Sequence, residues 1–174
     1  MLDRLIDLIL NFLHLFKFWV VIDEFEYGLV FTFGKPTREL KRGIRPVIPL
    51  AIEKVYVIRT WYDTVATTVQ SLVTKDAKNV SVQGTFKYRL MPDKIRAYII
   101  TLGDEGTALS DYIEASVSRV VENSTWDELV EKPEKIRQEV LEEVRKHLNQ
   151  FGFKFYDFQW TQKTYSRTLR LLMN

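Results

Sequence analysis

The chain of 174 residues contains no cysteine and only two histidines. Without cysteine, disulfides, thiol nucleophiles and thiolate metal sites are excluded. The sequence also lacks a glycine-rich phosphate loop, a dinucleotide-binding fingerprint, zinc-ligand spacing and a nucleophile elbow. The net charge is only +2, and no lysine-rich stretch is interleaved with stacking aromatic residues, which argues against nucleic-acid binding. The sequence therefore predicts a protein that is not an enzyme and that has no cofactor and no metal site.

The most apolar part of the chain is its beginning, residues 1–22. Residues 5–22 hold fourteen apolar side chains among eighteen. As a helix this stretch would be ~27 Å long, close to the ~30 Å hydrocarbon core of a bilayer. Its four polar residues recur every three or four positions and would form one narrow stripe. The opposite face would contact lipid through Leu5, Leu8, Ile9, Phe12, Leu13, Phe16, Trp19 and Val20.

Three alternatives stay open for this segment. The apolar residues contribute roughly −4 to −8 kcal/mol on insertion scales, and Asp7 and Lys17 cancel most of that gain. The segment either crosses the membrane with its polar stripe facing sister subunits, lies in the interface, or packs as a core helix of a soluble fold. The composition favours the membrane, so we expect the protein to be anchored there through its N-terminal segment.

Charge is unevenly distributed along the chain. Residues 28–100 contain thirteen Lys/Arg against five Asp/Glu, whereas residues 101–151 contain six against twelve. Either these are two solvated surfaces, or copies of the chain pack head to tail, with the basic lobe of one against the acidic lobe of the next. The basic residues near the apolar segment are expected to contact lipid headgroups. They are Arg4, Lys17, Arg38, Lys41, Arg42 and Arg45.

The pattern of the remaining residues predicts an α+β fold. Strands are expected at 27–34, 55–59, 64–72 and 80–90, the last with clear alternation of apolar and polar residues. A turn is expected at Lys35-Pro36 and an extended loop at 42–50. The predicted organisation is an apolar helix (1–22), a β-rich lobe (23–92), an αβ lobe (93–162) and a short C-terminal helix (163–174).

Helices are expected from residue 93 onwards. The sequence predicts a helix at 94–101 capped by Asp93, an apolar stripe over 109–121, a capping box at Thr125 and Glu128, and a helix at 133–150. A strand with aromatic residues on both faces follows at 153–160, and either the core or a subunit contact would explain those aromatics. The residues predicted to lie at an oligomer interface are Phe155, Tyr156, Phe158, Trp160, Leu169 and Leu172.

A series of short motifs occurs in a distinctive order between residues 23 and 160, which resembles the SPFH or band 7 superfamily of stomatins, prohibitins and flotillins. Two positions depart from the family pattern: Arg42 stands where proline is frequent, and Ala77 where glycine often follows aspartate. The chain also stops near the point where many members begin a long coiled coil, which puts assembly through that coiled coil in doubt. The motifs are Tyr27-Gly28-Leu29-Val30, Phe33-Gly34-Lys35, Gly43, Ile48-Pro49, Thr74-Lys75-Asp76, Val80-Ser81-Val82, Tyr88-Arg89, Val120-Val121, the turn at 124–129 and Phe151-Gly152-Phe153.

The resemblance implies a two-lobed domain and a scaffold function. Family members are anchored at one membrane face, assemble side by side into rings or cages, and organise lipid microdomains or enclose membrane proteases and channels. The expected partners are therefore membrane lipid, further copies of the chain, and a membrane protease or channel. An alternative of a different class is a soluble structural shell or ring protein whose N-terminal helix packs between subunits.

Overall fold

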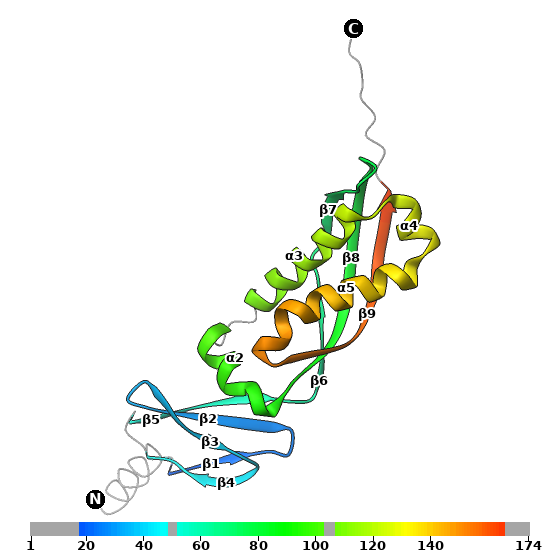
Figure 1. Ribbon diagram of the computed structural model, residues 1–174. Helices are drawn as coiled ribbons and strands as arrows, with labels where there is room; N and C mark the ends of the chain where they lie inside the picture. The colour runs from blue at the N-terminus through cyan, green and yellow to red at the C-terminus, as the bar shows by residue number, and fades with distance from the viewer. Residues whose placement is uncertain (1–17, 49–51, 103–106, 166–174) are drawn as a thin grey trace, which may run out of the picture. The chain divides into compact units, whose positions relative to one another are not determined.

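The computed structural model describes residues 18–48, 52–102 and 107–165 (Figure 1). The chain divides between Trp61 and Tyr62 into two compact units, which we call unit 1 and unit 2. The architecture is α+β, with strands first and helices later, as the sequence predicts. The boundary lies earlier than the predicted one at residue 92, because three strands assigned to the first lobe form a sheet with the last strand of the chain.

Unit 1 contains two small antiparallel sheets. In the larger one, β2 (Glu26–Thr32) lies between β3 (Lys35–Leu40) and β5 (Glu53–Arg59). In the smaller one, β1 (Trp19–Ile22) pairs with β4 (Gly43–Pro46). A common core joins them: Ile22 of β1 is buried with Val30 and Leu40, and Val20 and Val55 pack against this cluster.

Strand β1 corrects the predicted N-terminal helix over its last residues. Trp19–Ile22 is a strand, so the helical assignment is wrong for these four positions, while residues 1–17 lie outside the described residues. The physical reason is local: three successive β-branched side chains favour an extended backbone. Pairing with β4 then buries Ile22, which is 1% exposed.

Two further predictions in unit 1 are wrong in detail. The turn lies at Phe33 and Gly34, which have φ of 49° and 77°, and not at Lys35-Pro36. Positive φ at both central residues is the type I′ geometry that suits a two-residue hairpin. Pro36 is tolerated within β3 because β3 is an edge strand, and a register shift lies beside it. The predicted loop at 42–50 contains strand β4.

Unit 2 is built on one long central strand. β8 (Asn79–Leu90) pairs antiparallel with β9 (Phe153–Tyr165) on one side, and with β6 (Tyr62–Ala66) and β7 (Gln70–Val73) in succession on the other. Figure 1 shows helices over one face of this sheet. The helices and helical turns are η1 (Pro92–Lys94), α2 (Ile95–Leu102), α3 (Thr107–Asn123), α4 (Trp126–Glu131), α5 (Pro133–Leu148) and η2 (Asn149–Phe151).

The core of unit 2 follows the predicted periodicities. Alternate residues of β8 are buried, as the sequence predicts for a sheet with one covered face. The predicted stripes of α3 and α5 supply the opposing apolar surface, and β9 adds three phenylalanines. The buried residues include Val80, Val82, Phe86 and Leu90 of β8, Ile113, Val117 and Val121 of α3, Ile136, Val140, Val144 and Leu148 of α5, and Phe153, Phe155 and Phe158 of β9.

The helix ends confirm most of the predicted signals. Thr125 and Glu128 form a reciprocal capping box at the start of α4, and Pro133 occupies the first turn of α5. Gly152 has φ of 92° and ends the helical segment. Asp93 makes no cap, because η1 starts at Pro92 and its capping residue has no side-chain hydrogen bond.

Strand β9 extends to Tyr165, so the helix predicted for 163–174 is wrong over its first three residues. The rest of that segment, residues 166–174, lies outside the described residues. In the described ranges, no helix combines the length and the apolar content needed to span a bilayer.

Candidate membrane and assembly surfaces

The small β1–β4 sheet has one buried face and one exposed apolar face. Its register pairs Trp19 with Pro46 and Val21 with Ile44. Directly opposed residues share a face of a sheet, and alternate residues point to opposite faces. Trp19, Val21 and Ile44 are 64%, 57% and 73% exposed, whereas Ile22 on the other face lies in the core. We call Trp19, Val21, Ile44 and Pro46 the apolar β1–β4 face.

This face changes the predicted lipid contacts. Trp19 is exposed, but Val20 packs against the core cluster and is not available for lipid. The other six predicted contacts, Leu5 to Phe16, lie outside the described residues. Sequence reasoning missed Val21 and Ile44, because a helical period places Val21 away from Trp19. A period of two along 19–22 would have placed them together.

Three predicted headgroup residues come together beside this face. Arg38, Lys41 and Arg45 line one surface hollow of about 430 Å³, together with Glu39, Leu40 and Pro46. Pro46 belongs to both features, so the hollow borders the apolar β1–β4 face. Cationic side chains next to exposed apolar ones are typical of a surface that meets an anionic membrane.

The basic side chains of this region differ in the hydrogen bonds and ion pairs that they make. The Arg38 guanidinium donates to the Pro46 carbonyl at 2.7 Å and to the Glu53 carboxylate at 2.8 Å. The Arg45 guanidinium donates to the carbonyls of Lys41 and Arg42 at 3.0 and 3.1 Å. Arg42 makes an exposed ion pair with Glu24 at 3.5 Å. The Arg38 and Arg45 side chains therefore donate to backbone carbonyls. Among the cations that line the hollow, the ammonium of Lys41 is the exposed charge. Arg4 and Lys17 lie outside the described residues.

Glu53 fixes the charge state of the hollow. Its side chain is only 6% exposed. Its carboxylate accepts hydrogen bonds from the backbone N–H of Ile48 and from Arg38, both at 2.8 Å. These bonds, that of Ile48 foremost, lower the pKa of Glu53. The carboxylate therefore remains ionised and neutralises Arg38, which leaves the exposed ammonium of Lys41 to attract an anion.

The second surface lies on the face of the unit 2 sheet opposite the helices. Tyr62 of β6 and Tyr156 of β9 meet edge to face, with ring centroids 4.9 Å apart. The Lys87 ammonium lies 5.0 Å from the Tyr62 ring centroid and the Lys154 ammonium 5.4 Å from that of Tyr156. Arg89 lies 5.7 Å from the Tyr62 centroid. We call these five residues the basic–aromatic face.

A β-bulge places Tyr156 on this face. The register between β8 and β9 shifts at Lys87 and Tyr88, so that Tyr156 has no opposed residue. Tyr62 and Tyr156 are 52% and 37% exposed. Burial, and then the hydrogen bond with Tyr62, raises the pKa of Tyr156, which keeps its hydroxyl protonated.

The predicted oligomer interface is wrong at two of its residues. Phe155 and Phe158 are 1% and 0% exposed, and Phe158 stacks on Phe86 with a centroid distance of 4.3 Å. Both side chains belong to the core of unit 2 and cannot contact another subunit. Tyr156 remains exposed and Trp160 is half-buried. Leu169 and Leu172 lie outside the described residues.

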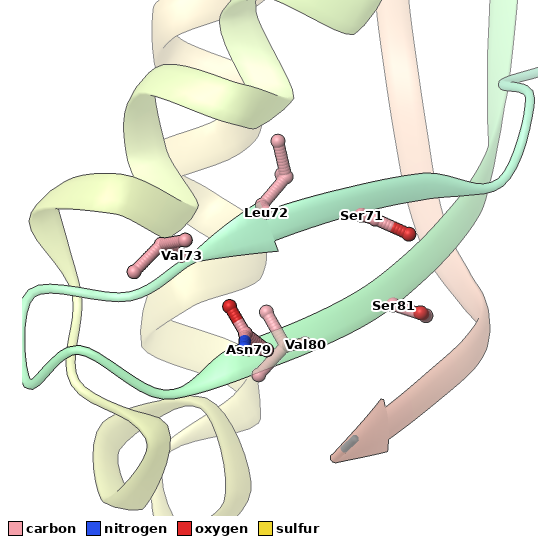
Figure 2. Close-up of a pocket in the computed structure, with 6 residues that line it drawn as sticks. All are labelled: Ser71, Leu72, Val73, Asn79, Val80 and Ser81. Atoms are coloured by element: carbon pink, nitrogen blue, oxygen red, sulfur yellow. The ribbon is translucent and has the colours of Figure 1, made fainter. Parts of the chain in front are cut away.

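A smaller hollow of about 250 Å³ lies at the β7–β8 hairpin (Figure 2). Leu72 opposes Val80, and Ser71 opposes Ser81. No acidic or basic side chain lines this hollow, so its lining provides no general acid or base. It offers hydroxyl and amide groups for hydrogen bonding alone. In the described ranges, no three acidic or histidine side chains lie close enough to hold a metal ion.

Comparison with known proteins identifies the family. The model of the SPFH domain / Band 7 family matches residues 20–173. The chain belongs to this family. The match begins within β1 and covers both units. SPFH proteins are generally membrane-associated, non-enzymatic scaffolds. An uncharacterized protein of Methanocaldococcus jannaschii is 27% identical over 151 residues, which cover 84% of this chain and 74% of that protein.

One departure from the SPFH pattern has a visible structural basis. Ala77 has φ of 58°, a left-handed conformation that suits glycine. It is held there by a tight turn, in which the Ala77 N–H donates to Thr74 O at 2.9 Å and the Thr74 hydroxyl donates to Asp76 at 2.6 Å. The turn is attached to α4, because the Trp126 N–H donates to Asp76 at 3.1 Å. Hydrogen bonds from Thr74 and Lys78 lower the pKa of Asp76.

Proposed function

We propose that this SPFH protein is a non-catalytic, membrane-anchored scaffold. It assembles side by side into a ring or cage and organises lipids or partner membrane proteins. The observation that carries the membrane part is the apolar β1–β4 face, which follows directly on the apolar residues 1–17 and borders the basic hollow. A contiguous apolar patch beside cations supports an interfacial contact.

The energetics favour an anchor made of two parts. Burying the three exposed apolar side chains of the face is worth roughly 3–5 kcal/mol, because each large apolar side chain contributes about 1.5–3 when fully buried and these start partly buried. Exposed Lys41 adds about 1 kcal/mol at an anionic surface. The apolar β1–β4 face alone therefore binds reversibly, and stable anchoring also requires the apolar N-terminal residues.

Vesicle flotation of the full chain tests the membrane part. The face variant Trp19→Ser/Val21→Ser/Ile44→Ser is expected to bind vesicles of phosphatidylcholine with phosphatidylglycerol about 100-fold more weakly, since roughly 3 kcal/mol of apolar burial is lost. The matched control Val73→Ser/Ile100→Ser/Val130→Ser removes three similarly exposed apolar residues of unit 2 and should float like the unaltered chain.

Deletion of residues 1–17 separates the two parts of the anchor. The shortened chain should retain weak binding through the apolar β1–β4 face, because Ile22 and the core of unit 1 are kept. Equal flotation of the face variant and the unaltered chain would contradict the role of the face. Recovery of the full chain as a monomer without detergent would contradict the scaffold as a whole. A closed assembly that ignores vesicles would favour the soluble-shell alternative.

A further inference from the structure

The basic–aromatic face has the chemistry of a protein contact. Tyrosine and arginine are enriched at the energetic centres of interfaces, and here two exposed tyrosines sit among three cations. One carboxylate, that of Asp157, directly opposes Lys87 across the two strands and lines the same hollow as Lys87. Asp157 is ion-paired with Arg137 of α5, and Asp63 alternates with Tyr62 along β6 and interacts with Tyr88. The face is therefore positive and fits a partner that presents carboxylates.

The same chain presents such carboxylates on α3 and α4. Glu122 lies at the end of α3, and Asp127 and Glu131 lie at the start and at the end of α4. All three are exposed, as is Lys132 after Glu131, and we call the three carboxylates the acidic corner. Asp127 has a distant ion-pair partner, Lys78, at 3.5 Å. Glu122 and Glu131 have no ion-pair partner among the described residues. By contrast, α5 carries four acidic and four basic residues, so the acidic excess of this lobe lies largely on α3 and α4.

The two surfaces lie at opposite ends of unit 2. The acidic corner is held at the start of β8, where Trp126 and Asp127 contact the turn at Asp76 and Lys78. The basic–aromatic face surrounds Arg89 at the other end of β8. At ~3.3 Å per strand residue, Lys78 and Arg89 are about 35 Å apart. One copy cannot bring its own two surfaces together, so a contact between them must join successive copies.

We propose that the basic–aromatic face of one copy binds the acidic corner of the next copy. This inference rests on the proposed assembly and specifies the contact that makes it. The contact is heterologous, since different surfaces of the two copies meet, and repetition of a heterologous contact generates a ring if the rotation closes. Tyr62 and Tyr156 supply the apolar centre, and the surrounding cations select a carboxylate partner.

Charge reversal on the full chain in detergent tests the contact, with sedimentation velocity as the measurement. Lys87→Glu/Lys154→Glu makes the face acidic, and Glu122→Lys/Glu131→Lys makes the corner basic. Each variant alone is expected to lose assembly and sediment as a monomer. An equal mixture of the two should assemble again, because each altered surface then meets a complement. The chain with all four substitutions should also assemble.

The control variant Arg96→Glu/Lys146→Glu makes the same charge change on exposed residues of α2 and α5, and should assemble like the unaltered chain. If Lys87→Glu/Lys154→Glu leaves assembly unchanged, the proposed contact is wrong and the scaffold proposal stands. Loss of assembly in both variants without recovery in the mixture or in the four-substitution chain also overturns the contact. An unaltered chain that is monomeric contradicts both the contact and the scaffold.

Discussion

The substitution Gly84→Ala probes the packing at the centre of β8. A methyl group added at Gly84 would lie 2.2 and 2.7 Å from two ring carbons of Phe158 and 3.2 Å from the carbonyl oxygen of Gln159. The Phe158 ring would have to move by ~1 Å to restore ordinary contact. It cannot do so freely, because it is fully buried, stacked on Phe86 and in edge contact with Trp160 at 4.7 Å.

We expect Gly84→Ala to lower the free energy of unfolding by about 2–2.5 kcal/mol. Overpacking of a core costs about 1–3 kcal/mol, and the rigid setting of Phe158 puts this position at the upper end. The lower backbone entropy of alanine in a strand offsets about 0.5–1 kcal/mol of it. Urea unfolding followed by circular dichroism measures the change, which should appear as a lower midpoint with an unaltered slope.

A double-mutant cycle with Phe158→Leu identifies the cause. The smaller side chain leaves room for the new methyl group, so the combined variant should lose at least ~1 kcal/mol less than the sum of the two single losses. Gly34→Ala is the control, because nothing lies within 4 Å of its added methyl group and only its positive φ is strained. Strict additivity, or a Gly84→Ala chain as stable as the unaltered one, would refute the packing argument.

Two further substitutions test the local backbone and the buried carboxylate. Ala77→Gly should raise the free energy of unfolding by up to ~1 kcal/mol, since glycine adopts φ of 58° without strain; a lower melting temperature would contradict this. Glu53→Gln should lower stability at pH 7 by roughly 1–3 kcal/mol, because Arg38 loses its partner. The lowered pKa of Glu53 means that its contribution is complete above the ordinary glutamate pKa and is lost as pH falls through the lowered value. The difference in melting temperature between the two chains should therefore shrink as the pH falls below the ordinary glutamate pKa, and a constant difference would count against the ion pair.

Local signals made much of unit 2 predictable from the sequence. The alternation along β8, the stripes of α3 and α5, the capping box at Thr125 and the stop at Gly152 each depend on residues within a few positions of one another. Family membership was also predictable, because several short motifs occur in a fixed order. Position 77 also carries a local signal. Glycine is frequent there in the family, and Ala77 has a φ of 58°, which suits glycine.

What the sequence could not provide depends on distant partners. Residues 19–22 are apolar enough for either a helix or a strand, and pairing with β4 decides between them. The boundary between the units depends on β9 returning to pair with β8 after more than sixty residues. The basic–aromatic face depends on the β-bulge at Tyr156, and the alternation of apolar and polar residues does not predict a bulge at that position. A strict alternation would also have separated Phe155 from Phe158, although both are buried.

Strand β1 begins at Trp19, so only Phe18 separates it from residues 1–17. The Phe18 carbonyl already accepts a hydrogen bond from Val47 at 2.8 Å, so the ladder starts within two residues of position 17. At ~3.3 Å per residue, the chain between residue 17 and the first residue of β1 is shorter than ~7 Å. A force that acts on residue 17 is therefore transmitted directly to the hydrogen bonds between β1 and β4.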